Sequence, residues 1–113
     1  MLIIPGVPAA AAAYLGAWGP GTGTAGSRDI RVIESIEKDG TAHILRMHAA
    51  CCGGQVHAGS TETVGQFVDG KIRLRLTGIV VDEQLELLGD GLMHMTLVGA
   101  NSVINRAVLP RLQ

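Results

Sequence analysis

The sequence predicts an all-β protein, an eight-stranded antiparallel up-and-down barrel with a short N-terminal helix. Short runs rich in Val, Ile, Leu and Thr alternate with three turns, Lys38-Asp39-Gly40, Val68-Asp69-Gly70 and Gly89-Asp90-Gly91. Asp-Gly between two apolar runs is a strong β-hairpin signal, because glycine accepts a positive φ. Consecutive hairpins of this number can close on themselves and remove both exposed sheet edges.

The elements follow in order along a single domain, residues 1–113. A proline followed by an alanine run predicts a helix of about two turns over residues 8–15. The segment 19–27 is rich in glycine and predicts a loop. A short strand is expected around Trp18. Seven further strands are expected at about 29–37, 41–50, 55–67, 71–77, 80–88, 92–98 and 102–109.

Composition excludes several classes of function. Hydrophobic residues make up 47% of the chain, charged residues 17%, and the formal net charge is -1. Such a chain lacks the positive field that gathers phosphates, so no nucleic-acid partner is expected. The apolar run 9–18 is shorter than the roughly 20 residues of a membrane span, so we expect no membrane insertion and a cytoplasmic location. Cys51 and Cys52 are adjacent, which strains a disulfide, so free thiols are expected.

The side-chain alternation of the later hairpins predicts which residues face the interior. Ile72 and Leu74 alternate with Lys71 and Arg73, so the residue two after the turn glycine points inward. The same rule directs three residues of the next hairpin inward, opposite three of the preceding strand: Met93, Met95 and Leu97, facing Leu87, Leu85 and Glu83. It also leaves Glu86 opposite His94 on the outside.

Applied to the first hairpin, the rule places polar side chains inside the barrel. The predicted inward residues are Ala42, Ile44, Arg46 and His48, facing Ile36, Glu34, Val32 and Ile30. A two-residue turn would instead expel Arg46, yet it would keep Glu34 inside. Glu34 is therefore the inward polar residue in both registers, and Glu83 is a second candidate nearer one end.

Two short segments resemble the lipocalin and calycin barrels. Gly16-Ala17-Trp18 precedes the first long strand, as in the Gly-x-Trp signature, and the last strand carries Arg106 and Arg111. The resemblance implies that Trp18 plugs the closed end of the barrel. It also implies that an arginine lies across the Trp18 ring, Arg111 first and Arg106 second.

The predicted function is the binding of a small, mostly apolar molecule inside the barrel. Its expected ligand-binding residues are the polar Glu34, Arg46, His48 and Glu83 and the apolar Ile44, Leu74, Leu85, Met93 and Met95. One alternative is an enzyme that uses Glu34 as general acid or base. Another is a homodimeric interaction module with a filled core, because Ile33, Val64 and Val108 are expected to point outward. No cofactor is expected, and the histidine spacing predicts no metal site.

Overall fold

The computed structural model describes residues 9–20, 22–23, 29–48, 59–77, 80–101 and 103–112. Its elements are α1 (Ala9–Ala12), β1 (Gly16–Trp18), β2 (Thr22–Gly23), β3 (Asp29–Ile36), β4 (Thr41–His48), β5 (Gly59–Val68), β6 (Lys71–Arg75), β7 (Val80–Leu87), β8 (Leu92–Gly99) and β9 (Val103–Pro110). The predicted helix is shorter than expected. Two residues of the predicted 19–27 loop form β2. Cys51 and Cys52 lie outside the described residues.

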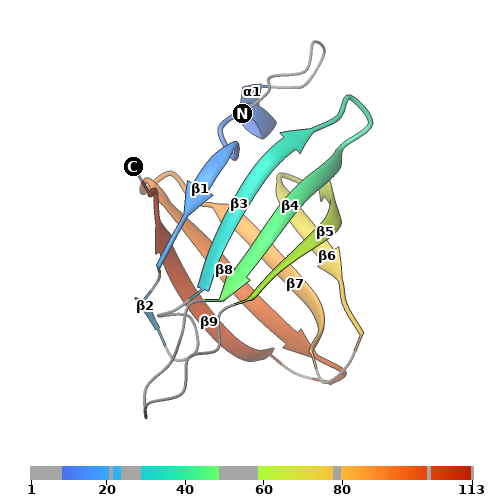
Figure 1. Cartoon of the computed structure of the whole chain (residues 1–113), viewed down its shortest axis with the longest axis vertical. Coiled ribbons are helices and arrows are strands. Elements are labelled where there is room, and N and C mark those ends of the chain that lie inside the picture. Colours follow the sequence, from blue (N-terminus) through green and yellow to red (C-terminus); the bar gives the residue numbers. More distant parts are fainter. Residues whose placement is uncertain are drawn as a thin grey trace.

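All strands belong to one antiparallel sheet with the order β1-β3-β4-β5-β6-β7-β8-β9-β2. β1 and β2 are consecutive in the chain yet lie at opposite ends of this order, so one segment joins both edges of the sheet (Figure 1). Two backbone hydrogen bonds add to this junction: Gly19 N–H donates to the Pro110 oxygen at 2.7 Å, and Leu112 N–H to the Ala17 oxygen at 2.9 Å. Counted as one interrupted strand, β1 and β2 complete an eight-stranded, nearly closed up-and-down barrel, which confirms the predicted fold class.

Gly19 allows the chain to pass from its pairing with β3 to its pairing with β9. Its φ is +115°, and a Cβ there would lie 2.4 Å from the backbone oxygen of Asp29. Only glycine accepts both the positive φ and this close approach of backbone. Gly19 therefore determines where β1 ends.

The three predicted hairpins are present, joining β3 to β4, β5 to β6 and β7 to β8. In the β5–β6 turn, Asp69 and Gly70 both have positive φ, 54° and 79°. This is the type I′ geometry, whose twist matches that of the flanking strands. The turn therefore sets the register in which Val68 pairs with Lys71.

The segment that contains α1 covers the barrel end that carries these three turns (Figure 1). Tyr14 is 3% exposed, and its hydroxyl donates to the Gly70 oxygen at 2.7 Å and accepts the Leu87 N–H at 2.9 Å. The Trp18 ring N–H donates to the Tyr14 oxygen at 2.9 Å. No helix in the described part of the chain has the length and apolar character needed to cross a bilayer.

Arg111 lies over the Trp18 ring, with its guanidinium carbon 4.0 Å from the ring centre. The same guanidinium donates to the Leu15 and Ala13 oxygens at 2.9 and 3.0 Å. This is the contact that the resemblance implied. It ties the last strand to the plugged end of the barrel.

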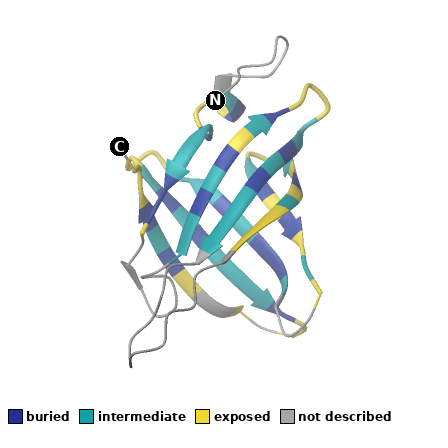
Figure 2. Cartoon of the chain, in the orientation of Figure 1, coloured by how far each residue is buried: buried dark blue, intermediate teal, exposed yellow. Residues whose placement is uncertain are grey.

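Buried residues alternate with more exposed ones along β3, β4, β6 and β8 (Figure 2). The register of β7 and β8 is the predicted one, with Leu85 opposite Met95, Leu87 opposite Met93, and Glu86 opposite His94. The apolar core comprises Ala11, Tyr14, Trp18, Ile33, Ile36, Ala42, Ile44, Ile72, Leu74, Leu85, Met93, Met95, Ala107 and Leu109.

Candidate functional site

A β-bulge in β3 changes which of its side chains enter the barrel. Ile33 pairs with Ile44 and Ser35 with His43, so Glu34 is the extra residue. One added residue reverses the alternation on one side of it. Glu34 is exposed, and the prediction that it points inward is wrong.

The residues before the bulge also face the opposite side of the sheet from the one predicted. Arg31 and Ile33 are buried, at 3% and 0% exposure, instead of the predicted Ile30 and Val32. Ile33 was expected on the outside, so that prediction is also wrong. Beyond the bulge, Ile36 is buried as predicted.

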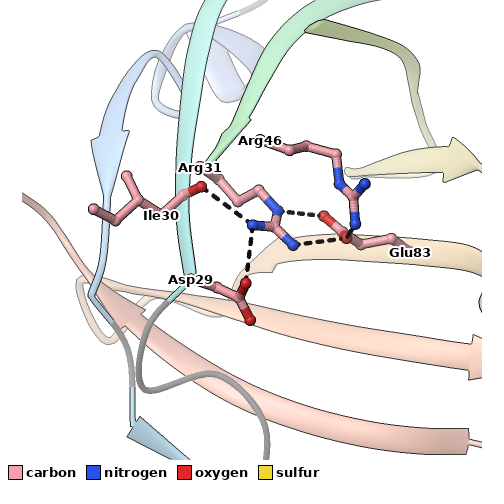
Figure 3. A network of polar contacts seen from close by, with 5 residues as sticks. All are labelled: Asp29, Ile30, Arg31, Arg46 and Glu83. Atoms are coloured by element: carbon pink, nitrogen blue, oxygen red, sulfur yellow. Dashed lines mark hydrogen bonds and ion pairs between the residues drawn. The ribbon is translucent and has the colours of Figure 1, made fainter. Parts of the chain in front are cut away.

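Arg31 forms a two-pronged ion pair with Glu83 inside the barrel (Figure 3). Its Nε donates to Oε2 of Glu83 at 2.7 Å, and its Nη2 donates to Oε1 at 3.0 Å. Glu83 is 0% exposed. The guanidinium comes from β3 and the carboxylate from β7, so the pair spans the interior between strands that are not neighbours in the sheet.

Arg46 is the second cation on this carboxylate. It lies directly opposite Arg31 in the β3–β4 register, and its Nη2 donates to Oε1 of Glu83 at 3.0 Å. The side chain is 27% exposed. Its Nε is buried and has no hydrogen-bond partner among the described residues. Within the described part of the chain, Arg46 is thus held by one hydrogen bond and keeps donor capacity.

Asp29 supplies further negative charge to the cluster. Its Oδ1 lies 3.6 Å from Nη1 of Arg31, which also donates to the Ile30 oxygen at 3.1 Å. Burial is the largest single influence on Arg31 and acts to lower its pKa, but the hydrogen bond and charge of Glu83, assisted by Asp29, outweigh it and raise the pKa. Arg31 is therefore a permanent, fully engaged cation.

The cluster lies toward the barrel end opposite α1. Glu83 is four residues before the end of β7, and its register neighbours are Leu74 on β6 and Leu97 on β8. Leu97 is partly buried and packs against the core. The interior is therefore divided into an apolar half under α1 and a half in which apolar walls surround charged groups.

The structure brings together only some of the predicted site residues. Five apolar ones are buried in one cluster: Ile44, Leu74, Leu85, Met93 and Met95. Arg46 and Glu83 are in contact inside the barrel. The side chain of His48 lies outside the described residues. Arg31 was not predicted to be an inward residue. The apolar residues Ile33 and Ile36 are three positions apart within a predicted strand, and this break in the two-residue period could have indicated a bulge.

A separate surface pocket of about 350 Å³ lies on the outer face of β3, β4 and β5. It is lined by Glu34, His43, Ile44, Glu62, Thr63 and Val64. The His43 ring is held at 2.7 Å by the carboxylate of Glu37. Within the described ranges, no three His, Cys, Asp or Glu side chains are grouped so as to hold a metal ion.

Comparisons of the chain with protein-family models, with curated proteins and with solved structures find no match. The barrel is compatible with a calycin-like fold on its topology and on the Trp18–Arg111 contact. Arguments about function therefore depend on the chemistry of the site.

Proposed function

We propose that this barrel binds a small, mostly apolar molecule that carries an anionic group, and that Arg46 is its anchor. The observation that carries the proposal is the Nε of Arg46, which is buried and has no hydrogen-bond partner among the described residues, on a side chain that is still 27% exposed. A guanidinium has five N–H donors and favours a carboxylate or phosphate in two-pronged geometry. A buried donor without a partner costs free energy, which a bound anion would recover.

The neighbouring groups support this role for Arg46. Arg31 is engaged by Glu83, Asp29 and a backbone oxygen, and it is only 3% exposed. Glu83 fixes the position of both guanidinium groups. Arg46 is therefore preorganised, which lowers the entropic cost of binding. Leu97, which lies opposite Glu83 in the sheet and is only partly buried, offers apolar surface to the rest of the ligand.

The geometry favours binding over acid–base catalysis. Glu34, the predicted general acid or base, is exposed on the outer face. Both carboxylate oxygens of Glu83 accept hydrogen bonds from arginines, whereas a general base needs to reach a substrate proton. The proposed site lies within one chain, so it does not require the homodimer that the sequence predicted.

A pair of matched fluorescent probes tests the proposal. 1-Anilinonaphthalene-8-sulfonate carries an anion, and N-phenyl-1-naphthylamine has the same rings without it. We expect Arg46→Gln to weaken binding of the sulfonate by about tenfold to a hundredfold, the value of a hydrogen bond to a charged group. Binding of the neutral probe should change little.

Arg75→Gln is the matched control, because Arg75 is an exposed arginine at the end of β6. It should leave the affinity for both probes unchanged. The proposal fails if Arg46→Gln and Arg75→Gln alter sulfonate binding equally, or if Arg46→Gln weakens both probes to the same extent.

A further inference from the structure

One half of β5 lacks a neighbouring strand on one side. β5 pairs with β4 from Gly59 to Gln66 without a break in register. Its pairing with β6 covers only Gln66 to Val68. β6 is five residues long, and Arg75 at its end pairs with Asp82 of β7. Among the described residues, the stretch 59–65 therefore presents an open sheet edge on its β6 side.

The hairpin determines which backbone groups this edge exposes. Val68 and Lys71 flank the two-residue turn, and such flanking residues exchange backbone hydrogen bonds. By alternation, the N–H and C=O groups of Val64 and Glu62 point to the same side of β5 as those of Val68. They are the backbone groups that an added strand would bind.

Within the described ranges, the edge lacks several of the features that protect most sheet edges. Proteins usually block an edge with lysine, proline, a bulge or a covering segment. The stretch 59–65 contains neither lysine nor proline, and its register with β4 shows no bulge. Glu62 is exposed, and Val64 is 59% exposed. Such an edge is a template for addition of an extended segment.

The charge beside the edge indicates the chemistry of that segment. The 350 Å³ pocket shares Glu62, Thr63 and Val64 with the edge and adds Glu34 from the bulge of β3. Glu34 and Glu62 form no ion pair with any described residue. A lysine or arginine opposite Val64 or Glu62 could reach these carboxylates, and opposite charges on adjacent strands attract.

We propose that the open edge of β5 binds an extended segment of another protein, with basic side chains at alternate positions facing the outer surface. Backbone pairing with Val64 and Glu62 gives the affinity, and the pocket lined by Glu34 and Glu62 gives the preference for basic residues. A second copy of this chain fits less well, because antiparallel pairing of two β5 edges around Glu62 would bring like charges together.

Fluorescence anisotropy with the full chain tests the proposal. The probe is a fluorescein-labelled nonapeptide that alternates lysine and valine, and we expect saturable binding. Methylation of every second peptide nitrogen removes the edge hydrogen bonds and should weaken binding at least about tenfold. Replacement of lysine by glutamate in the peptide should abolish binding.

Variants of the protein separate the two contributions. Val64→Pro removes one edge N–H and should weaken binding about tenfold, while Val64→Thr keeps the N–H and should not. Glu62→Gln should weaken binding about threefold, as an exposed ion pair does. Glu86→Gln, on the outer face of β7, is its control and should have no effect. Circular dichroism checks that each variant is folded.

Three results would overturn the proposal. One is equal binding of the methylated and unmethylated peptides to the wild-type protein, which needs no variant and would show charge attraction alone. Another is the absence of saturable binding. The third is a dimer in sedimentation velocity that Val64→Pro dissociates, because the edge would then belong to a second copy of the chain.

Discussion

Replacing Glu83 by glutamine removes the one carboxylate that both interior arginines share. Three charge-assisted hydrogen bonds, at 2.7, 3.0 and 3.0 Å, lose their ionised acceptor. The amide nitrogen of the new side chain also faces a guanidinium donor. Among the described residues, Arg31, 3% exposed, then retains only Asp29 at 3.6 Å as a counter-charge.

The expected loss follows from this geometry. Removing one partner of a buried ion pair costs about 3–5 kcal/mol, because a charge remains without compensation. Asp29 compensates part of the charge of Arg31, so we expect a loss near the lower end, about 3 kcal/mol. Small domains have a free energy of unfolding of roughly 5–15 kcal/mol, so this loss is a large share of it.

Urea unfolding followed by Trp18 fluorescence measures the effect. Trp18 is the only tryptophan in the chain and is 1% exposed, so its emission reports the opening of the barrel. Glu86→Gln is the control on the same strand, and it should change the free energy of unfolding by less than about 0.5 kcal/mol. The reasoning is refuted if Glu83→Gln costs no more than this control.

A triple apolar variant adds a second test of the same reasoning. Arg31→Met, Arg46→Met and Glu83→Leu together remove all three charges at similar volume. Such replacements are often neutral or stabilising, so stability should return to within about 1 kcal/mol of the wild type or exceed it. The triple variant should also lose binding of the anionic probe, which would separate the role of the cluster in binding from its role in stability.

Three further predictions concern Tyr14 at the plugged end of the barrel, Gly65 on β5 and Asp39 in the β3–β4 turn. Tyr14→Phe leaves the partly buried N–H of Leu87 without its 2.9 Å acceptor, so urea unfolding should show a loss of about 1–3 kcal/mol. Gly65→Ala places a Cβ 2.9 Å from a backbone oxygen of β6, and this overpacking should cost about 1–3 kcal/mol, visible as a lower midpoint in thermal unfolding. The backbone hydrogen bond from Thr41 lowers the pKa of Asp39, so its contribution to stability is present above the unfolded pKa of about 3.9 and is lost as pH falls through the folded value. In a series of unfolding curves from pH 6 to pH 2, Asp39→Asn should remove that part of the decline; an unchanged pH profile would contradict the assignment.

The sequence was sufficient to predict the barrel because turn chemistry and alternation agree over most of the chain. Asp69-Gly70 sets its hairpin by local conformation alone, and β7 and β8 keep an unbroken register from Leu85 opposite Met95 to Leu87 opposite Met93. The inward positions of Leu85, Met93 and Met95 follow from these two signals and are confirmed. The Gly-x-Trp resemblance added the Trp18–Arg111 contact, which no local periodicity could have predicted.

The charged cluster was predicted only in part, for a physical reason. A bulge depends on how a strand pairs with its neighbour, which the sequence of one strand does not show. Strict inward–outward alternation therefore assigns the wrong face to every residue on one side of the bulge. The bulge at Glu34 moved that carboxylate outside and Arg31 inside. Arg46 and Glu83 lie inside the barrel as predicted, because the bulge lies on β3 and β4 keeps its own alternation.

The contact that joins the first and last strands of the barrel has a consequence for folding during translation. Arg111 bonds to the Leu15 and Ala13 oxygens across 96 and 98 residues of sequence. Contacts of such separation carry a high loop-closure entropy and form slowly. In a nascent chain β8 can pair with β7, but its other edge stays open until β9 follows, so a late rise in Trp18 protection should mark the emergence of β9 and Arg111.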